Sequence, residues 1–392
     1  MTANHSPSPS RVSLVRCGSY DSAFLKDAVG SALDHLGGPA RLIRPGQRVL
    51  LKPNVMMPKP YGFAANTHPE FVRAVIEVFK DAGAEVWVGE SSAGSQAGMT
   101  LTKKALSASR LDAIADEAGA RLINFDLDGV VTVRLNNRFA DSVPIAKAVR
   151  EANLVVSLPK LKTHTYANII TGAVKNLYGC VPGQIKAEFH RRAPRPLEFF
   201  TIVRDIYGSI RPGLAIFDAV EGMEGNGPSA GRPRAIGLVI ASTDPVAADA
   251  VAAEVIGVPS LRVTTTRLCH EAGLGRGDMK DIQLAGESLE SVRVADFVKP
   301  STAVVNPHLY RFILKATETI PVIDAKTCTR CRVCLQSCPM KAISEKDGRM
   351  VIDRLACIRC FCCAEVCQEQ AITPKRKNKL GDLLSKMMFA RW

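Results

Sequence analysis

The stretch CTRCRVCLQSCP (residues 328–339) has a near copy, CIRCFCCAEVCQ, at residues 357–368. Both carry the spacing C-x₂-C-x₂-C-x₃-C, and their surroundings repeat with the same offset: VID at 322–324 returns at 351–353, and AI at 342–343 returns at 371–372. Nine of the twelve cysteines fall between Cys328 and Cys367. Such a duplicated half predicts a small pseudo-symmetric module whose cysteines bind metal.

This repeat resembles the bacterial two-cluster ferredoxins over residues 321–374. The resemblance implies a small α+β domain with two 4Fe–4S clusters, in which three closely spaced thiolates bind one cube and the fourth cysteine binds the other. Carried over by position, the first cluster would be held by Cys328, Cys331, Cys334 and Cys367. The second would be held by Cys357, Cys360, Cys363 and Cys338.

The ninth cysteine of this region, Cys362, aligns with Val333, so we expect it to pack locally and to bind no iron. Pro339 has Gln368 as its equivalent, a departure from the ferredoxin pattern that leaves the ligands intact. Zinc would need four ligands per ion, but it does not call for this spacing twice. Three isolated cysteines are expected to be buried packing residues: Cys17, Cys180 and Cys269.

The composition favours an ordinary globular protein. The 392 residues suffice for two domains, and no apolar run approaches the roughly 20 residues that span a bilayer. The polar N-terminus shows no secretory signal, so a cytoplasmic location is expected. The formal charge of +13 allows nucleic acid, membrane surface or acidic partners. Nucleic acid is not expected, because interleaved aromatic residues and known binding motifs are missing.

The first 300 residues alternate between strand-like and helix-like segments. Nearly continuous apolar runs predict strands at 12–17, 48–54, 85–90, 121–125, 153–158, 214–217 and 236–241. Helical spacing predicts helices at 68–83, 101–119 and 245–256. Apolar strands separated by helices predict an α/β domain with an open, largely parallel sheet covered on both faces.

The remaining boundaries come from changes in composition. Residues 301–320 are interpreted as a connecting helix or linker between the α/β domain (1–300) and the ferredoxin-type module (321–374). Residues 375–392 form a basic tail whose apolar positions share one helical face. We expect this tail to dock on its own protein, or else to contact a membrane surface or a partner.

Polar residues follow several of the predicted strands. In an open parallel sheet, ligands bind outside the carboxyl ends of the strands. The candidates at these ends, and at the start of the helix that follows residue 171, are Lys52, Asn54, Lys160, Lys162, His164, Lys175 and Asn176. Two further segments follow strands: residues 221–228, expected as a flexible loop, and residues 242–245.

Several lysines at one crevice would suit an anionic ligand such as a carboxylate or phosphate, and His164 could pass a proton. The chain lacks G-x-x-x-x-G-K-[ST], so no P-loop is expected. Its glycine-rich segments also lack the G-x-G-x-x-G order, which leaves a dinucleotide site unsupported.

Four segments together resemble the domain-of-unknown-function 362 family over about residues 12–290: LLKPN (50–54), LPKLKTH (158–164), TGAVKN (171–176) and FDAVEGMEGNGP (217–228). The resemblance implies an α/β fold and redox work, with a ferredoxin module commonly fused to it. The recurrent polar positions of the family match the same seven residues that the strand ends indicate.

Two hypotheses follow. In the first, the chain is an iron–sulfur oxidoreductase: an external low-potential donor loads two 4Fe–4S clusters, and single electrons pass to an anionic substrate or cofactor in the N-terminal domain. Lysines would hold this ligand, and His164 would donate the proton. In the second, the chain is a non-catalytic electron carrier or assembly partner whose N-terminal domain recognises another protein. A deep charged crevice favours the first, and a flat face favours the second.

Overall fold

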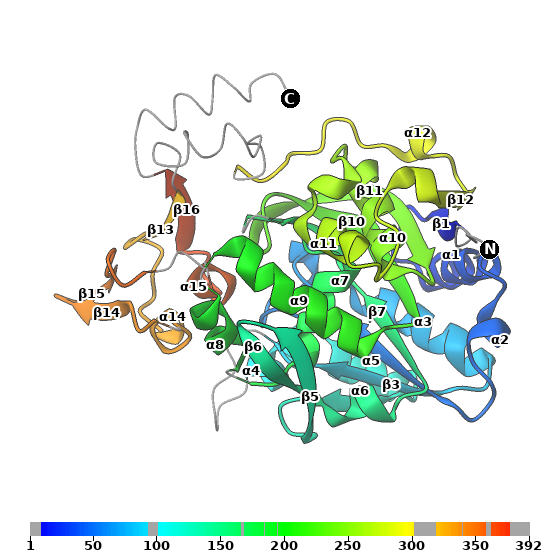
Figure 1. Cartoon of the computed structure of the whole chain (residues 1–392), viewed down its shortest axis with the longest axis horizontal. Helices are drawn as coiled ribbons and strands as arrows, with labels where there is room; N and C mark the ends of the chain where they lie inside the picture. Colours follow the sequence, from blue (N-terminus) through cyan, green and yellow to red (C-terminus); the bar gives the residue numbers. More distant parts are fainter. Residues whose placement is uncertain are drawn as a thin grey trace, which may run out of the picture.

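A computed structural model of the chain describes residues 9–92, 101–165, 168–183, 185–193, 195–301, 319–338, 340–357 and 362–376. Within these residues the larger part is a ten-stranded sheet flanked by helices (Figure 1). Along its main path the strands are β12 (Ile282–Gly286), β1 (Ser10–Arg16), β11 (Ala230–Ser242), β10 (Leu214–Asn226), β7 (Leu154–Leu158), β2 (Arg48–Pro53), β3 (Glu85–Glu90) and β4 (Arg121–Asn124).

The sheet is mostly parallel, as the sequence predicts. Strands β10, β7, β2, β3 and β4 run in one direction, whereas β11 is antiparallel to both of its neighbours, β1 and β10. The end of β11 at Ser242 therefore lies at the opposite edge from the ends of β2, β3 and β7. The expectation that residues 242–245 would join the other strand ends is wrong, and Asp244 instead caps helix α10 (Pro245–Val255).

Both faces of the sheet are covered. In β2, Val49 and Leu51 pack into one apolar cluster while Leu50 packs into another, because alternate side chains of a strand point to opposite faces. The first face is covered by α1 (Ser22–Asp34), α3 (Pro69–Asp81) and α5 (Leu111–Glu117). The second is covered by α7 (Gly172–Asn176), α9 (Pro196–Ile210), α10 and α11 (Thr264–Glu271).

Helix boundaries follow local chemistry. The ring of His68 accepts the Glu70 N–H as the N-cap of α3, and Pro69 occupies the first turn, where its missing N–H costs nothing. The predicted helix at 101–119 is divided into α4 (Leu101–Ala108) and α5. The break falls at Arg110, whose φ of 58° is left-handed and ends a right-handed helix.

The glycine-rich segment at residues 221–228 is mostly strand, so its prediction as a flexible loop is wrong. Strand β10 continues through it to Asn226 and pairs with β11 over almost its whole length. Residues 160–164, which follow β7, form a short strand of their own, β8 (Lys160–His164), beside β10 and β9 (Ile169–Ile170). A separate hairpin joins β5 (Val130–Asn137) and β6 (Ala140–Ala146).

The C-terminal part is a small α+β unit of ferredoxin type. Strand β13 (Thr319–Ile323) pairs with β16 (Ile372–Arg376), and β14 (Ile343–Lys346) pairs with β15 (Arg349–Ile352). Two short helices, α14 (Val333–Gln336) and α15 (Cys362–Glu365), follow the first cysteines of each half. Cys360, the predicted linker at 302–318 and the tail from 377 lie outside the described residues. No helix among the described residues is long and apolar enough to cross a membrane.

Candidate functional site

The two halves of the C-terminal unit exchange equivalent backbone hydrogen bonds. The N–H of Asp324 donates to the Ala371 carbonyl at 2.7 Å, and the N–H of Asp353, 29 residues later, donates to the Ala342 carbonyl at 2.7 Å. Each bond joins one half to the other. The sequence repeat is therefore also a structural repeat, and each half closes on its partner.

The cysteine sulfurs share this symmetry. The N–H of Ala342 lies 3.2 Å from Cys338 Sγ, and the N–H of Ala371 lies 3.2 Å from Cys367 Sγ. These are the fourth cysteines of the two repeats. N–H donors directed at sulfur stabilise thiolates, and such bonds are among the features that tune iron–sulfur clusters.

Cys334 lies among cysteines from both halves. Burial, together with the charges of Cys331, Cys367 and Cys328, raises its pKa to about 11. As thiolates, these four cysteines would repel one another. A cationic iron cluster bound between them would remove this repulsion. These are the four cysteines that the resemblance to two-cluster ferredoxins assigns to the first cluster, an assignment that stays a prediction. Of the second set, Cys357, Cys363 and Cys338 are described.

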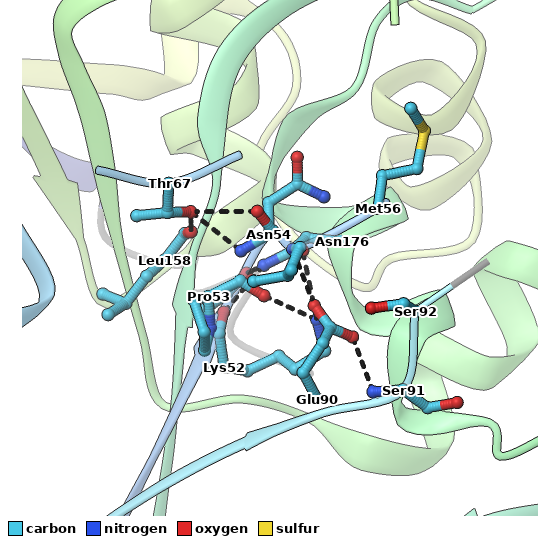
Figure 2. Close-up of polar contacts among 12 residues, drawn as sticks. Lys52, Pro53, Asn54, Met56, Thr67, Glu90, Ser91, Ser92, Leu158 and Asn176 are labelled. Atoms are coloured by element: carbon cyan, nitrogen blue, oxygen red, sulfur yellow. Dashed lines mark hydrogen bonds and ion pairs between the residues drawn. The ribbon is translucent and has the colours of Figure 1, made fainter. Parts of the chain in front are cut away.

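At the carboxyl ends of β2 and β3, Lys52 forms a buried ion pair with Glu90. Its ammonium donates to Glu90 Oε2 at 2.7 Å, to the Pro53 carbonyl at 2.7 Å and to Asn176 Oδ1 at 3.3 Å (Figure 2). Glu90 also accepts the N–H groups of Val55 and Ser91. Sequence reasoning missed Glu90, although it ends a predicted strand.

Lys160 has a similar partner on the neighbouring strand. Its ammonium lies 2.9 Å from Asp218 Oδ2 and 2.6 Å from the hydroxyl of Tyr20, which donates to Asp218 Oδ1 at 2.8 Å. The Tyr20 ring stacks on His68 with their centroids 3.6 Å apart. Burial lowers the pKa of His68 to about 4, so this imidazole is neutral at physiological pH. Tyr20 was not predicted.

The remaining predicted residues lie close by. Lys160, Lys162 and His164 alternate along β8, which places them on one face of that strand, and all three are buried. The ammonium of Lys162 donates to the Ala65 carbonyl. Asn176 also donates from Nδ2 to the Lys52 carbonyl at 2.9 Å. Lys175 is half-buried.

Asn54 is half-buried after β2. Its N–H donates to Thr67 Oγ1 at 2.8 Å. Its side-chain Oδ1 is buried and has no hydrogen-bond partner within the part of the chain that the structure describes. A buried acceptor without a partner is costly, so this oxygen suits a ligand or an ordered water. Asn54 is therefore the predicted residue with spare hydrogen-bonding capacity at this edge.

Two further buried lysines were missed. Lys186 donates to the carbonyls of Ser91 at 2.6 Å and Ser92 at 3.0 Å, and burial lowers its pKa to about 8. Lys59 donates to the Ser229 carbonyl at 3.1 Å. Neither lysine follows a strand directly, so no local signal marked them. The edge thus gathers five buried lysines: Lys52, Lys59, Lys160, Lys162 and Lys186.

Two of these five lysines form buried ion pairs with carboxylates on neighbouring strands. Two fully buried carboxylates, Glu90 and Asp218, lie in ion-pair contact with these lysines, and each pairs with one of them. Lysine is almost never fully buried without a partner, because an unpaired ammonium loses its hydration. Positive side chains gathered at one edge of a sheet also create a field that would attract an anionic ligand.

The ferredoxin-type unit contacts the N-terminal domain beside Lys59. The Ser229 hydroxyl donates to the Ala364 carbonyl at 3.2 Å, and Gln370 Nε2 donates to the Ser229 carbonyl at 2.6 Å. Burial lowers the pKa of Lys59, while Cys367 and Glu369 act in the opposite direction. A predicted cluster ligand therefore lies close to one of the buried lysines.

Comparison with known proteins gives two family profiles, one similar sequence and one similar structure. A 4Fe-4S dicluster domain profile matches residues 320–368. The thylakoid-associated protein sll1697 of Synechocystis sp. is 35% identical over 271 residues, which cover 67% of this chain and 79% of that protein. The lactate racemase apoprotein of Thermoanaerobacterium thermosaccharolyticum superposes with a TM-score of 0.39 and 16% identity, over 61% of this chain and 55% of that one. The profile of the domain of unknown function DUF362 matches residues 49–254, and the chain belongs to this family, with an iron–sulfur domain at its C-terminus.

Proposed function

We propose that this protein is an iron–sulfur oxidoreductase that reduces an anionic substrate or cofactor held at the carboxyl edge of its N-terminal sheet. Two bound 4Fe–4S clusters would supply electrons singly. The observation that carries the proposal is the cluster of five buried lysines among the described residues of this edge, next to the contact at Ser229. An external low-potential donor would serve the C-terminal unit, and the proposed setting is the cytoplasm, where thiols stay reduced.

The lysines would divide into two groups. Lys52 and Lys160 are fixed by Glu90 and Asp218, so they would shape the site and set its positive field. We assign direct contact with the anionic group to Lys162 and Lys175, with Asn176 orienting Lys52. Asn54 Oδ1, an acceptor, would instead bind a hydroxyl or N–H of the same ligand, or an ordered water. His164 would donate the proton that reduction of an organic anion requires.

The test uses full-length protein reconstituted without oxygen and reduced with dithionite. Fractions of anionic small molecules from anaerobic cell extract are added, and reoxidation is followed by visible absorbance. We expect at least one fraction to reoxidise the wild type, and Lys162→Gln to slow this at least tenfold with unchanged iron content. The control is Lys147→Gln, at an exposed lysine that begins helix α6 (Lys147–Glu151). If no anionic fraction reoxidises the wild type, the proposal is wrong.

One observation favours the alternative, a non-catalytic carrier or assembly partner. Lys52 and Lys160 are already neutralised inside the protein, as purely structural lysines would be. In that case a partner protein, and no small anion, would reoxidise the clusters. The basic C-terminal tail would then be a candidate contact for that partner or for a membrane surface.

A further inference from the structure

The contacts that the ferredoxin-type unit makes at Ser229 come from its second half. Ser229 lies between β10 and β11, and its carbonyl accepts from Lys59 of the N-terminal domain and from Gln370 of the second half. Its hydroxyl donates to Ala364, also in the second half. All three bonds converge on one residue, next to the segment that carries Cys367.

The two halves have matching backbones at the position that contacts Ser229, so the difference between them lies in the side chains. Gln370 is the repeat equivalent of Lys341, and both adopt left-handed φ values, 53° and 51°. Each also donates its N–H to the carbonyl of the preceding cysteine, Gln370 to Cys367 and Lys341 to Cys338. The backbones match, yet the Gln370 side chain contacts Ser229 while Lys341 is exposed.

We infer that Lys59, Ser229 and Gln370 fix the Cys367 side of the unit against the N-terminal domain, so that the cluster held by Cys328, Cys331, Cys334 and Cys367 is the one nearer to that domain. Lys59 is then a positioning residue for that cluster, and it also acts on its reduction potential. This inference rests on the proposed function only in requiring that the clusters assemble.

The position of Lys59 predicts the direction in which its charge shifts the reduction potential of the nearer cluster. Reduction adds one negative charge to a cluster, and a fixed cation nearby favours the reduced form. Lys59 is 4% exposed, so water screens its charge weakly. Removing this charge is expected to lower the reduction potential of the nearer cluster and to leave the farther one unchanged.

The first test is a potentiometric titration of reconstituted full-length protein, followed by electron paramagnetic resonance. In Lys59→Met we expect one of the two midpoint potentials to fall, and the shifted signal to be the one that Cys331→Ser alters. Lys59→Arg should retain the wild-type value. The control is Lys346→Met, an exposed charge in the β14–β15 hairpin, which projects away from the N-terminal domain in Figure 1. Equal shifts of both potentials, or none, would overturn the inference.

A second test addresses the contact itself and stands even if Lys59→Met does not fold. Asparagine tolerates the left-handed backbone of position 370 but is one methylene too short to keep the bond. In Gln370→Asn, amide hydrogen exchange should accelerate at residues 227–231 and 364–371. The matched change Lys341→Asn in the other half should have no such effect. Unchanged exchange in Gln370→Asn would contradict the docking.

Neither test needs a substrate. Failure to find an anionic acceptor would count against the proposed function alone, whereas an unshifted potential and unchanged exchange would count against this inference alone.

Discussion

The carboxylate of Glu90 lies 2.7 Å from the ammonium of Lys52, and both side chains are at most 2% exposed. Each charge stabilises the other, because either one alone would be buried without a counter-charge and without water. The same reasoning applies to Lys160 and Asp218 on the next strand. Replacing one member of such a pair should therefore destabilise the protein more than replacing both members with neutral residues.

We expect Lys52→Met to lower the free energy of unfolding by about 3–5 kcal/mol, because it leaves Glu90 buried and unpaired. Glu90→Gln should have a similar cost. The double variant should cost clearly less than the sum of the two. Urea unfolding of all three measures this. Lys147→Met, which breaks an exposed i,i+4 pair with Glu151, serves as the control and should cost at most about 0.5 kcal/mol. Equal effects at positions 52 and 147 would contradict the prediction.

Asp249 should make stability depend on pH. Burial raises its pKa to about 8, although the N–H groups of Ala173 and Val174 oppose this. Between about pH 4 and pH 8 the folded state therefore holds a proton that the unfolded chain has lost, so this residue's contribution falls as pH rises. Asp249→Asn should gain stability relative to the wild type on going from pH 5 to pH 8.5. Denaturant unfolding at both pH values measures it, and a pH-independent difference would refute the assignment.

Ligand sets that cross between the halves can be tested by pairing cysteine variants. The wild type should bind about eight irons, from two four-iron clusters. Cys331→Ala and Cys367→Ala should lose the same paramagnetic signal, although they lie in different repeats. Cys338→Ala and Cys357→Ala should lose the other. Cys362→Ser should keep the full iron content. If Cys367→Ala instead removed the same signal as Cys357→Ala, each half would bind its own cluster.

Replacing glycine with alanine should have opposite effects on stability at Gly227 and Gly30. At Gly227 a Cβ would lie 2.1 Å from the Thr163 carbonyl oxygen, a backbone atom that cannot move alone. Gly227→Ala should therefore cost about 1–3 kcal/mol. At Gly30, within α1, a Cβ would meet nothing within 4 Å, so Gly30→Ala should stabilise by about 1 kcal/mol. Thermal or denaturant unfolding distinguishes the two, and equal effects would show that close packing near Thr163 is unimportant.

Sequence periodicity predicts the central strands of the N-terminal sheet well, because buried parallel strands are apolar without interruption. It does not predict helices α1, α9 and α11 or the β5–β6 hairpin. It fails in β10, where glycines such as Gly222 suggest a loop. That position needs glycine because a Cβ would lie 2.7 Å from the Leu161 carbonyl, so the residue marks a close approach of two strands. It also fails to show that β11 runs antiparallel, since strand direction depends on the whole sheet.

Residues of the candidate site can be predicted from the sequence where a charged or polar residue ends a predicted strand or directly follows it. Lys52 and Lys160 were found this way, and Glu90 could have been found by the same rule. Lys186 and Lys59 come from segments distant in sequence and reach the edge only through the tertiary fold. The repeat, in contrast, identifies the eight candidate cysteines directly, because their spacing is local within each half, whereas their division into two crossed sets comes from the resemblance to two-cluster ferredoxins.

The acceptor at position 229 that joins Lys59 to Gln370 is a main-chain carbonyl, which every amino acid possesses. A change of the side chain at 229 would therefore leave the two bonds to its carbonyl in place and remove only the bond that its hydroxyl donates to Ala364. Most of this contact between the two domains is thus encoded by the path of the main chain, and the serine adds one bond to it.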